Sequence, residues 1–581
     1  MTTREKNSDA LVPAKVTRRG IEIPFLALTA KAGEGWVQTF LKKRLTVVEK
    51  PQKGRPKSYS LEKRSAYTIL RAERLLVVPR AQAAAVAEFV ECLEQSPENF
   101  LPPPRPESPG APPGDLWRPA QAFYGYQNAA AEYLATGPLS RTGFAYLQMG
   151  TGLGKSRLAM AVAARYRGPV FVVVPTKGLR AQWLEEFRAV FPRLACGSYE
   201  NPPKNSKKAP AGPATHDVLV GIVNTVRTKD REFFRGFSTV ILDEAHELHS
   251  PANKNVLWTV QAAPYVLGLS ATPLESERGL DQIVCRFLGE PIYAEKDIPG
   301  FNVADVRFSG RVREVQYYGH PDYCEAVLSD AGTVCAASTI GLLVQDPFRL
   351  RLVASEVARL YNLHSSESPA VLRRLGLGPA GGAAPGAGRT RKHGIFVFAE
   401  LRDYLPALRD ALLEFFAECK SDAPEIDAPE IDAPEGGAPE GGAGVPVVLR
   451  GGATAEEQQA SRRARIVLTT YGYSRRGVSI VDMTAIVLAT PRRTGMTQIL
   501  GRVTRRGSDE SIVRQVVDLK DMGSPLKSQS TACNGRRSAY KQKNYPIYRA
   551  RVNYADVDLE AFRVHNPGVL DEELVWAPGA A

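Results

Sequence analysis

The sequence of 581 residues lacks three patterns that would each assign it to a distinct class of protein. Its seven cysteines stand singly and form no C-x-x-C pair, which argues against a disulfide scaffold and against a zinc site. No apolar run is long enough to cross a bilayer, and residues 1–10 are polar where a signal peptide would be apolar. We therefore expect a soluble, intracellular protein with no membrane partner.

Positive charge, in contrast, is present in excess. The formal net charge is +13, and the isoelectric point is about 9.3. Such an excess favours a polyanionic partner, because neutralising phosphates releases counterions and supplies most of the sequence-independent affinity for nucleic acid. Basic proteins are also often merely basic, so the distribution of the charge matters. Two basic clusters stand out, at residues 42–64 and 502–551.

The chain is too long for one hydrophobic core, and three or four domains are expected. Short apolar runs alternate with helical patterns in two parts of the chain, as in parallel sheets covered on both faces. Two inserts, 376–390 and the acidic 421–445, are expected to be loose surface loops. The predicted fold class is α/β, with a small β-containing N-terminal domain (1–97), a Pro-rich linker (98–116), a first P-loop domain (117–290), a connecting helical region (291–390), a second α/β domain (391–520) and a basic C-terminal extension (521–581).

The most informative motif is a glycine-rich turn between the apolar run 144–147 and the helical pattern 157–166. Backbone N–H groups of such a turn, together with the helix dipole, form a cradle for phosphates. The lysine of the motif reaches the outer phosphates, and the following serine hydroxyl binds Mg²⁺. We therefore predict a nucleoside triphosphatase whose phosphate loop consists of Gly150, Thr151, Gly152, Leu153, Gly154, Lys155 and Ser156.

A second motif follows the apolar run 239–242, where Asp243 and Glu244 stand at the end of an expected strand. This position is the carboxyl edge of the sheet, beside the phosphate loop, so Asp243 can hold Mg²⁺ together with Ser156. Glu244 is then the carboxylate able to orient and deprotonate the attacking water. An Asp-Glu pair after a strand can also be an ordinary helix N-cap, but its place one βαβαβ module after a phosphate loop favours catalysis.

These motifs belong to an ordered set that resembles the superfamily 2 helicases and translocases of the DEAH kind. The resemblance covers roughly residues 117–520 and implies ATP and Mg²⁺ bound between two tandem RecA-like domains. The segments that carry it are 150–156, 175–183, 243–246, 270–273, 395–399, 469–480 and 498–505.

The resemblance also implies roles for residues of the nucleotide site. Arg502 and Arg505, three apart on an expected helix, would act as arginine fingers that stabilise charge at the γ-phosphate. Without the other motifs, a solvated basic helix face would explain these two arginines. Gln498 would face His246 or the nucleotide across the cleft, and Gln127 would bond the adenine edge. The residues implied to couple hydrolysis to domain movement are His246, Ser270 and Thr272.

By the same resemblance, polar residues in the loops after the strands contact the phosphate backbone of a nucleic acid. Such contacts position the strand without reading its sequence. DNA is favoured over RNA as the partner. Ser479 departs from the family pattern, which carries an acidic residue for ribose contact at this position. The phosphate-contacting residues are Thr176, Arg180, Gln182, Asn224 and Thr225 in the first half, and Thr470, Arg475 and Arg476 in the second.

Details of residues 473–518, together with the small N-terminal domain, resemble helicases of large nucleocytoplasmic DNA viruses of the poxvirus transcript-release type. This closer resemblance implies a role in viral transcription or replication, with that machinery as a partner, in the host cytoplasm or nucleus. After residue 519 basic residues alternate with tyrosines, as in Arg536, Arg537 and Tyr540. The pattern fits a strand-gripping surface and an ordinary amphipathic extension equally well.

Three other functions compete with a helicase. A duplex-DNA translocase would remodel protein–DNA complexes without separating strands. A non-catalytic nucleic-acid scaffold would carry a relic ATPase site, but the intact Lys155, Asp243, Glu244 and Arg505 argue against it. A nucleotide kinase would share the phosphate loop, yet it would not need a second α/β module with arginines.

Overall fold

The computed structural model describes residues 12–51, 60–87, 90–92, 116–150, 152–201, 212–274, 278–301, 308–330, 332–362, 393–422, 445–474, 480, 482–492, 495–504, 512–526, 528–556 and 572–578. The chain divides into two compact units, one running to residue 303 and one beginning at residue 304, residues 151–153 aside. Almost all of the expected linker and of the two expected inserts lies outside the described residues. No helix within the ranges given is both long and apolar enough to cross a membrane.

The first unit begins with a small five-stranded sheet that two helices cover. Its elements are β1 (Val12–Thr17), β2 (Gly20–Pro24), α1 (Phe25–Ala32), α2 (Glu34–Arg44), β5 (Thr68–Leu70), β6 (Leu75–Val78), η1 (Arg80–Gln82), α3 (Ala83–Val86) and β7 (Val90–Cys92). The strand order is β5-β6-β2-β1-β7, with β1 and β7 parallel and the other pairs antiparallel. Leu28 of α1 and Val37 and Leu41 of α2 pack into the core of this sheet. The predicted strands near the N-terminus are therefore confirmed.

A separate hairpin of β3 (Thr46–Val48) and β4 (Lys63–Ser65) connects this small sheet to the rest of the first unit. Val47 on β3 and Ala66 just after β4 are fully or almost fully buried. Both belong to the hydrophobic cluster that covers one face of the following large sheet, not to the core of the small sheet. The N-terminal segment therefore supplies part of the large sheet's core.

Arginines anchor the N-terminal segment further. Nε of Arg278 lies 2.7 Å from Oε1 of Glu49, and its Nη2 lies 2.9 Å from Oε2 of Glu62. The Glu49 carboxylate is buried, so this pairing compensates a charge withdrawn from water. Arg80 is also buried and donates from Nη2 to the carbonyl of Gln261 over 2.8 Å. The first unit is thus held together by both apolar packing and charged hydrogen bonds.

The large sheet of the first unit has seven parallel strands. They are β8 (Phe144–Gln148), β9 (Val170–Val174), β10 (Cys196–Tyr199), β11 (Val218–Ile222), β12 (Thr239–Leu242), β13 (Tyr265–Ser270) and β14 (Pro291–Tyr293), in the order β10-β11-β9-β12-β13-β8-β14. Every residue of β9, β12 and β13 is buried, so both faces of these strands are covered. Continuous apolar runs are what such strands require, and the runs predicted as strands are confirmed to within about two residues.

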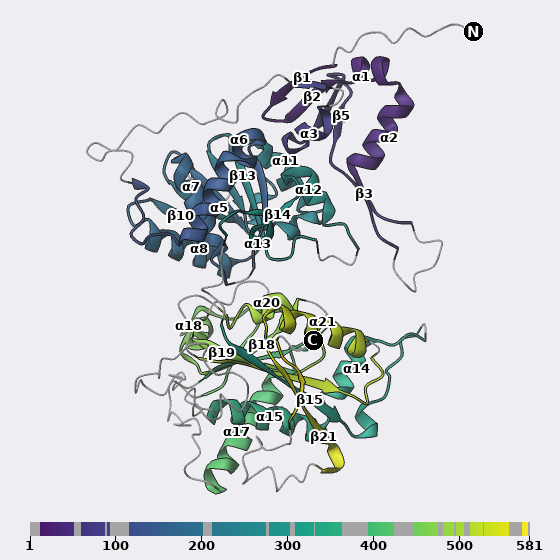
Figure 1. Ribbon diagram of the computed structural model, residues 1–581, viewed down its shortest axis with the longest axis vertical. Coiled ribbons are helices and arrows are strands. Elements are labelled where there is room, and N and C mark those ends of the chain that lie inside the picture. The colour runs from purple at the N-terminus through teal and green to yellow at the C-terminus, as the bar shows by residue number, and fades with distance from the viewer. Residues whose placement is uncertain are drawn as a thin grey trace. The chain divides into compact units, whose positions relative to one another are not determined.

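Helices pack around this sheet (Figure 1). They are α5 (Gly125–Thr136), α6 (Pro138–Thr142), α7 (Lys155–Tyr166), α8 (Lys177–Val190), α9 (Val223–Val226), α10 (Arg231–Arg235), η3 (Ala245–His249), α11 (Lys254–Thr259), η4 (Val260–Ala262), α12 (Gln282–Leu288) and α13 (Ala294–Asp297). Helices α11 and α12 bury Leu257 and Ile283 against the sheet in the same cluster as Val47.

The second unit contains an eight-stranded sheet. Its strands are β15 (Gly310–Tyr318), β16 (Gly394–Ala399), β17 (Val447–Leu449), β18 (Ile466–Thr470), β19 (Met483–Leu488), β20 (Arg514–Asp521), β21 (Ile547–Asn553) and β22 (Glu573–Trp576), in the order β17-β18-β16-β19-β20-β15-β21-β22. All neighbours are parallel except β21 and β22. Its helices are α14 (Ala336–Leu343), α15 (Pro347–Asn362), α17 (Tyr404–Asp422), α18 (Ala455–Arg463), α19 (Tyr471–Ser474), α20 (Met496–Leu500) and α21 (Ser528–Gln542).

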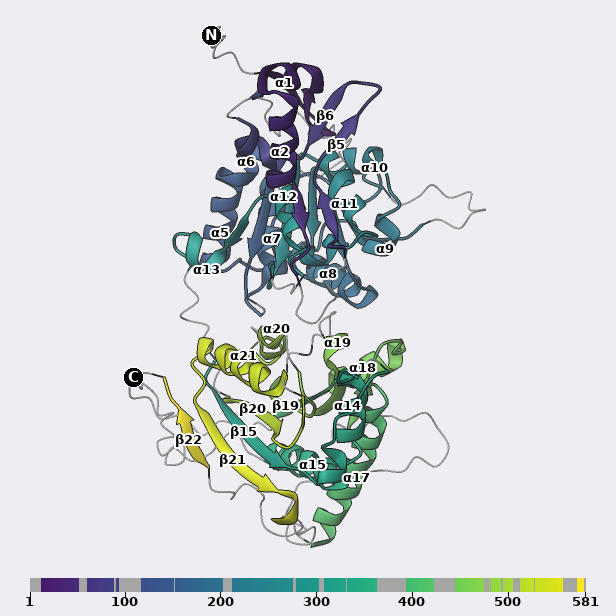
Figure 2. The same cartoon turned by 90° about the vertical axis from the view of Figure 1, so that its right-hand side faces the viewer.

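Two segments of the second unit differ from expectation. The region predicted as a helical connection supplies β15, which pairs with β20. The predicted C-terminal extension supplies β21, which pairs with the other edge of β15, and β22, which pairs with β21 (Figure 2). Charged side chains interrupt the apolar pattern of β15, where Val312, Val315 and Tyr317 are buried among arginines and a glutamate. The strand was missed because a fully apolar run was taken as the sign of a buried parallel strand. The domain boundaries themselves stay predictions.

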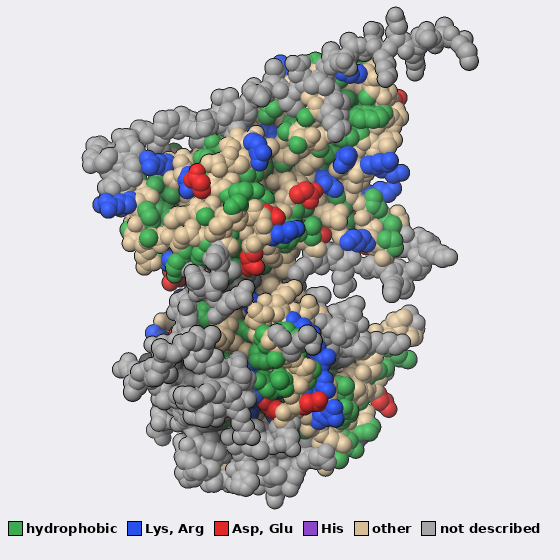
Figure 3. Space-filling model, viewed as in Figure 1, with side chains coloured by type: hydrophobic (Ala, Val, Ile, Leu, Met, Phe, Trp, Pro, Cys, Tyr) green, Lys and Arg blue, Asp and Glu red, His purple; other side chains and the backbone are tan. Residues whose placement is uncertain are grey.

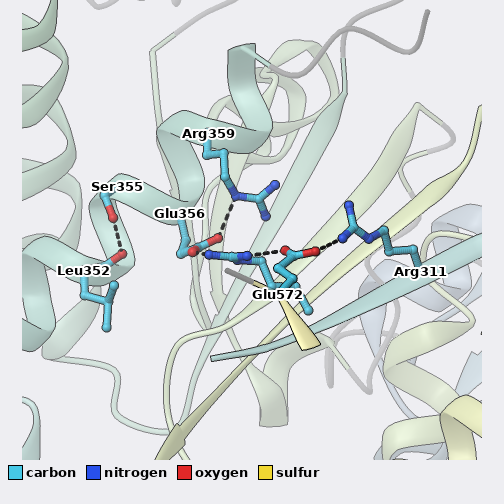
Figure 4. A network of polar contacts seen from close by, with 7 residues as sticks. Arg311, Leu352, Ser355, Glu356, Arg359 and Glu572 are labelled. Atoms are coloured by element: carbon cyan, nitrogen blue, oxygen red, sulfur yellow. Dashed lines mark hydrogen bonds and ion pairs between the residues drawn. The ribbon is translucent and has the colours of Figure 1, made fainter. Parts of the chain in front are cut away.

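Ion pairs neutralise the buried charges of β15. Nε of Arg313 lies 2.9 Å from Glu356, and Nε of Arg359 lies 2.8 Å from the other oxygen of the same carboxylate. Glu572, just before β22, binds both Arg311 and Arg313 (Figure 4). Burial alone would raise the pKa of Glu356, but the two arginines beside it outweigh burial and hold the pKa below its usual range.

The basic residues of α21 have the same structural task. Arg536 is fully buried with its Nη1 3.0 Å from Asp518, and Arg537 pairs with the buried Glu314 over 2.6 Å. The hydroxyl of Tyr540 donates to Asp518 over 2.9 Å. These three side chains hold α21 against the sheet. Arg536 and Tyr540 are fully buried and therefore do not offer a surface to a strand. For the rest of the region, the strand-gripping surface and the structural alternative both stay predictions.

Candidate nucleotide-binding site

The predicted phosphate loop connects β8 to α7. Two of its glycines have left-handed backbone angles, with φ of +87° at Gly152 and +79° at Gly154. Side chains rarely tolerate such angles, and a Cβ added to Gly154 would lie 2.6 Å from the amide nitrogen of Gln127. The loop therefore needs glycine at position 154 for both conformation and space. Thr151 lies outside the described residues.

Helix α7 begins directly after the loop, at Lys155, and Ser156 stands in its first turn. Nζ of Lys155 donates to the carbonyl of Met149 over 3.3 Å. Met149 is buried, and its backbone N–H donates to the carbonyl of Ser270 over 3.1 Å. The ammonium group is thus held at the loop, and the loop is bonded to the end of β13.

Gln127 on α5 lies against this loop, as the predicted contact with adenine requires. Its side-chain amide, however, forms hydrogen bonds with backbone groups. Its Oε1 accepts from the N–H of Tyr124 over 3.1 Å, and its Nε2 donates to the carbonyl of Gly154 over 3.3 Å. The side chain is fully buried. It therefore joins the start of α5 to the phosphate loop, and contact with adenine stays a prediction.

Asp243 follows β12 and is fixed by three hydrogen bonds. Its N–H donates to the carbonyl of Val173 over 2.9 Å, and its carboxylate accepts from Nε1 of Trp183 over 2.8 Å and from the N–H of Glu244 over 3.0 Å. Burial raises the pKa of Asp243 to about 6, and the neighbouring carboxylate of Glu244 adds to this. The Trp183 hydrogen bond and the Lys155 ammonium act in the opposite direction.

Glu244 has a left-handed backbone with φ of +48°, which is uncommon for a residue with a side chain. Its Oε2 lies 3.4 Å from Nδ1 of His246. The two successive carboxylates therefore have different neighbours, Trp183 for Asp243 and His246 for Glu244.

His246 links this turn to the next strand. Its Nδ1 lies 2.9 Å from Oγ of Ser270, the last residue of β13, and that hydroxyl also accepts the N–H of Thr272 over 3.0 Å. Ser270 and Thr272 are both buried. The structure therefore brings together the three residues predicted to couple hydrolysis to movement, although it does not test that role.

The predicted strand-contacting residues of the first unit follow β9 and β11 at the same sheet edge. Thr176 caps α8 by accepting the N–H of Leu179, while Arg180 pairs with Glu200 over 2.7 Å and Gln182 bonds Glu186 over 2.8 Å. Asn224 and Thr225 lie on the short helix α9. Because Arg180 already pairs with Glu200, a nucleic-acid phosphate would have to compete with that carboxylate for it. Contact of these five residues with nucleic acid stays a prediction.

In the second unit, Thr470 ends β18 and accepts the N–H of Tyr473 over 3.2 Å. Gln498 and Arg502 are buried. The expectation that Arg502 lies on a continuous helix is wrong, because α20 ends at Leu500 and Arg502 donates its N–H to Ile499, three residues back. Arg475, Arg476, Ser479 and Arg505 lie outside the described residues.

Two supporting residues were not recognised from sequence. Trp183 was read only as part of a motif, although a buried indole N–H normally requires an acceptor, which Asp243 provides. Arg514, fully buried on β20, donates to the carbonyls of Val503 over 2.6 Å and Ile512 over 2.7 Å. It thereby supports the turn that carries Arg502, and no local sequence signal indicated this.

Comparison with known proteins gives a nearly full-length match. A protein of African swine fever virus named "Putative ATP-dependent RNA helicase QP509L" is 34% identical over 565 residues, which cover 97% of this chain and 96% of the viral protein. The "Putative helicase 109L" of invertebrate iridescent virus 3 is 28% identical over 130 residues, 22% of this chain and 38% of that protein. Residues 79–275 match the family described as type III restriction enzyme, res subunit.

Among solved structures, that of S. cerevisiae Dbp5 bound to RNA and ADP BeF3 aligns with 76% of this chain. The alignment includes 93% of the Dbp5 chain, with 14% sequence identity and a TM-score of 0.45.

A phosphate loop and an Asp-Glu pair at the carboxyl edge of one parallel sheet, followed by a second parallel α/β unit, define a P-loop ATPase of the helicase class. The match over nearly the whole chain is more specific: this chain belongs to the family of viral ATP-dependent helicases that includes the African swine fever virus protein. It is therefore an enzyme that uses ATP and binds nucleic acid.

Proposed function

We propose that this chain hydrolyses ATP at the edge formed by β8, β12 and β13 and uses the hydrolysis to move along a single nucleic-acid strand. The observation that supports this most is a continuous set of bonds among the three motifs at that edge. Met149 of the loop bonds Ser270, and Ser270 bonds His246, which lies beside Glu244. A change at the loop can thus reach the end of β13 through one hydrogen bond and His246 through a second.

The residues divide the chemical work between them. Lys155, now at the Met149 carbonyl, is assigned to the outer phosphates, and the N–H groups of the loop to the phosphates between them. Glu244 is assigned to orient the attacking water and accept its proton. Arg502 and Arg505 are assigned to the charge that develops at the γ-phosphate.

Mg²⁺ is assigned to the Ser156 hydroxyl and the Asp243 carboxylate. These oxygen donors suit Mg²⁺, because the negative charge of Glu244 lies beside that of Asp243 and a bound cation would offset the repulsion between them. No three His, Cys, Asp or Glu side chains gather around a common point in the described part of the chain. Phosphate oxygens and water would complete the shell, as Mg²⁺ prefers. When bound, Mg²⁺ neutralises charge on the phosphates.

We further propose that the strand is RNA and that the enzyme serves viral transcription or replication. No sequence motif separates DNA from RNA, and the expectation of DNA rested on none. The relative matched over nearly its full length is named an RNA helicase and comes from African swine fever virus. The strand contacts assigned above are to phosphates, which both nucleic acids carry, so only a direct comparison separates them.

The decisive experiment measures the ATPase rate of the full chain with single-stranded RNA, single-stranded DNA and duplex DNA as stimulators. We expect single-stranded RNA to stimulate most. Glu244→Gln should lower kcat about 100-fold or more while ATP still binds. Glu232→Gln, which changes an exposed carboxylate, should have no effect. Absence of stimulation by any nucleic acid would overturn the proposal.

A duplex translocase predicts a different result. It would displace a triplex-forming strand from duplex DNA and fail to separate a partial duplex with a single-stranded tail. The proposed helicase would separate the tailed duplex.

A further inference from the structure

The segment between β15 and α14 contains a short hairpin that presents apolar side chains to solvent. We call residues 327–330 and 332–335 the α14 hairpin. Leu328 and Val334 lie opposite each other in an antiparallel bridge, and they are 58% and 44% exposed. Ala326 and Ala336 beside them are exposed too. A single exposed leucine needs no explanation, but two large apolar side chains directly opposite each other share one face of the hairpin.

Hydrogen bonds fix the shape of the α14 hairpin. The N–H of Ser329 donates to the carbonyl of Thr333 over 2.8 Å. The N–H of Cys335 donates to the carbonyl of Val327 over the same distance. The hydroxyl of the buried Thr339 on α14 joins both arms, because it accepts the N–H of Val327 over 3.2 Å and donates to the carbonyl of Cys335 over 2.8 Å. A segment that only connected β15 to α14 would need no such support.

The bonding pattern places the backbone groups of Leu328 and Val334 on the outer edges of the hairpin. The two hydrogen bonds between the arms join the residues on either side of this pair, so the pair itself is of the non-hydrogen-bonded kind. The N–H and C=O groups of such a pair point away from the opposite arm. Among the described residues, neither Leu328 nor Val334 forms a backbone hydrogen bond. Each arm therefore offers an edge to which a further strand can pair.

The surroundings of the α14 hairpin are acidic, although the chain as a whole is strongly basic. Residues 314–348 form the longest stretch of the sequence without Lys or Arg, whereas the net charge of the chain is +13. Glu325 precedes the hairpin and Asp330 lies in its turn, and both are exposed. Figure 3 shows hydrophobic side chains and an acidic group on the surface of the second unit at the side where Figure 1 labels α14. A surface of this charge repels nucleic acid and favours a basic partner.

We propose that the α14 hairpin binds an extended segment of another protein in which apolar side chains alternate with Lys or Arg. The segment pairs with an edge of the hairpin as an added strand, because the backbone groups there are free to bond it. Its apolar side chains cover Leu328 and Val334, and its cations lie near the carboxylates of Glu325 and Asp330. The two-residue period of a strand separates the two kinds of side chain. This proposal does not depend on the motor function proposed above.

The test uses a fluorescent synthetic peptide, Lys-Val-Lys-Val-Lys-Val-Lys, as the probe. Fluorescence anisotropy measures its binding to the nucleotide-free full chain. A version with Glu in place of every Lys should not bind. A version with Pro in place of the central Val should bind about 10-fold more weakly, because proline cannot donate to a strand ladder.

Variants of the hairpin test each part of the proposed contact. Leu328→Ser combined with Val334→Ser should raise the Kd of the basic peptide about 10-fold or more, because two apolar contacts are lost. Glu325→Gln combined with Asp330→Asn should raise the Kd about threefold at low salt and weaken its salt dependence. Leu26→Ser, which removes an equally exposed leucine from the first unit, should leave the Kd unchanged.

Hydrogen exchange locates the bound peptide. The N–H groups of Leu328 and Val334 should exchange rapidly in the free chain and slowly when the basic peptide is bound. Asp410→Asn, which replaces an exposed carboxylate elsewhere in the second unit, is the control for the charge and should show the same protection. Melting temperatures of all variants should match that of the natural chain, because the replaced side chains are exposed.

Failure of the natural chain to bind the basic peptide would overturn the proposal. Equal binding by the natural chain and by the variant with Leu328→Ser and Val334→Ser would also overturn it, as would protection confined to other segments. Equal affinity for the acidic peptide would overturn the choice of a basic partner.

An apolar hairpin in a helicase could instead separate the strands of a duplex, and the same double variant tests this alternative. With no partner protein present, Leu328→Ser combined with Val334→Ser should keep the rates of ATP hydrolysis and of strand separation of the natural chain. A fall in the rate of strand separation alone would assign the hairpin to the duplex and overturn the proposal of a protein partner.

Discussion

The indole N–H of Trp183 donates to Oδ2 of Asp243 over 2.8 Å and so joins α8 to the turn after β12. Trp183 is almost fully buried, and the carboxylate it contacts has a pKa of about 6. The hydrogen bond stabilises the ionised form of Asp243, while burial and Glu244 destabilise it. A residue outside the phosphate loop thus tunes the charge of the carboxylate assigned to Mg²⁺.

Replacing Trp183 by Phe should raise the pKa of Asp243 further, because the ring remains and the donor is lost. We expect the acidic limb of the ATPase pH profile to move to higher pH. Loss of a hydrogen bond to a charged group should also lower the free energy of unfolding by about 1–3 kcal/mol. Trp258→Phe is the matched control, since Trp258 packs against Phe287 in the same unit without contacting Asp243. An unmoved pH profile in Trp183→Phe would contradict the assignment.

Asp243→Asn should stabilise the nucleotide-free protein at pH 8. Asp243 has a pKa of about 6 when folded and an ordinary value near 4 when unfolded, so the folded state binds the proton more tightly. Its ionisation therefore costs folding free energy above pH 6, with an upper bound of about 3 kcal/mol, and this cost disappears as the pH falls from 6 to 4. Melting temperatures measured from pH 8 down to 5 should show the advantage of Asn shrinking.

The exposed Asp410→Asn serves as the control and should change the melting temperature equally little at every pH. A constant difference between Asp243→Asn and the natural chain across this range would show that the carboxylate does not titrate as argued.

Ser270→Ala should separate ATP hydrolysis from movement. The substitution removes the hydroxyl that bonds both His246 and the N–H of Thr272, but it leaves Lys155 and Glu244 in place. We expect the nucleic-acid-stimulated ATPase rate to fall less than threefold and the rate of strand separation to fall about 10-fold or more. Ser140→Ala, on an exposed helix of the same unit, should change neither rate. Equal losses of both rates would assign Ser270 to hydrolysis itself.

Arg278→Ala should destabilise the first unit by about 2 kcal/mol, because it removes charged hydrogen bonds to the buried Glu49 and to Glu62. Arg235→Ala removes an exposed pairing with Glu232 and should cost less than about 1 kcal/mol. Urea unfolding followed by tryptophan fluorescence measures both. A cost for Arg278→Ala no larger than that for Arg235→Ala would mean that Glu49 is satisfied without it.

The parts of the fold that could be predicted from the sequence are those that a short, local sequence pattern determines. Buried parallel strands read as apolar runs, as Val170–Val174 does, and a glycine-rich turn before a helix marks a phosphate loop. Strand β15 escaped that rule because its charges are neutralised by partners far along the chain, such as Glu356 and Glu572. Such pairings depend on tertiary structure and leave no local signal.

The candidate site shows the same division. The position of Asp243 and Glu244 could be predicted from the sequence, because residues that follow an apolar parallel strand lie at the carboxyl edge of the sheet. The hydrogen bond from Trp183, the pairing of Arg180 with Glu200 and the early end of α20 were not readable, because each depends on neighbours that only folding brings together.

The contact between Glu49 and Arg278 spans 229 residues of sequence. On a ribosome, the β3–β4 hairpin is made early, but the strands and helices that bury Val47 and Ala66 follow up to residue 288. The hairpin must therefore wait, with its apolar side chains exposed, until nearly half of the chain has been synthesised. We expect the first unit to fold late and in one step during synthesis, with its N-terminal segment the part most in need of chaperone protection.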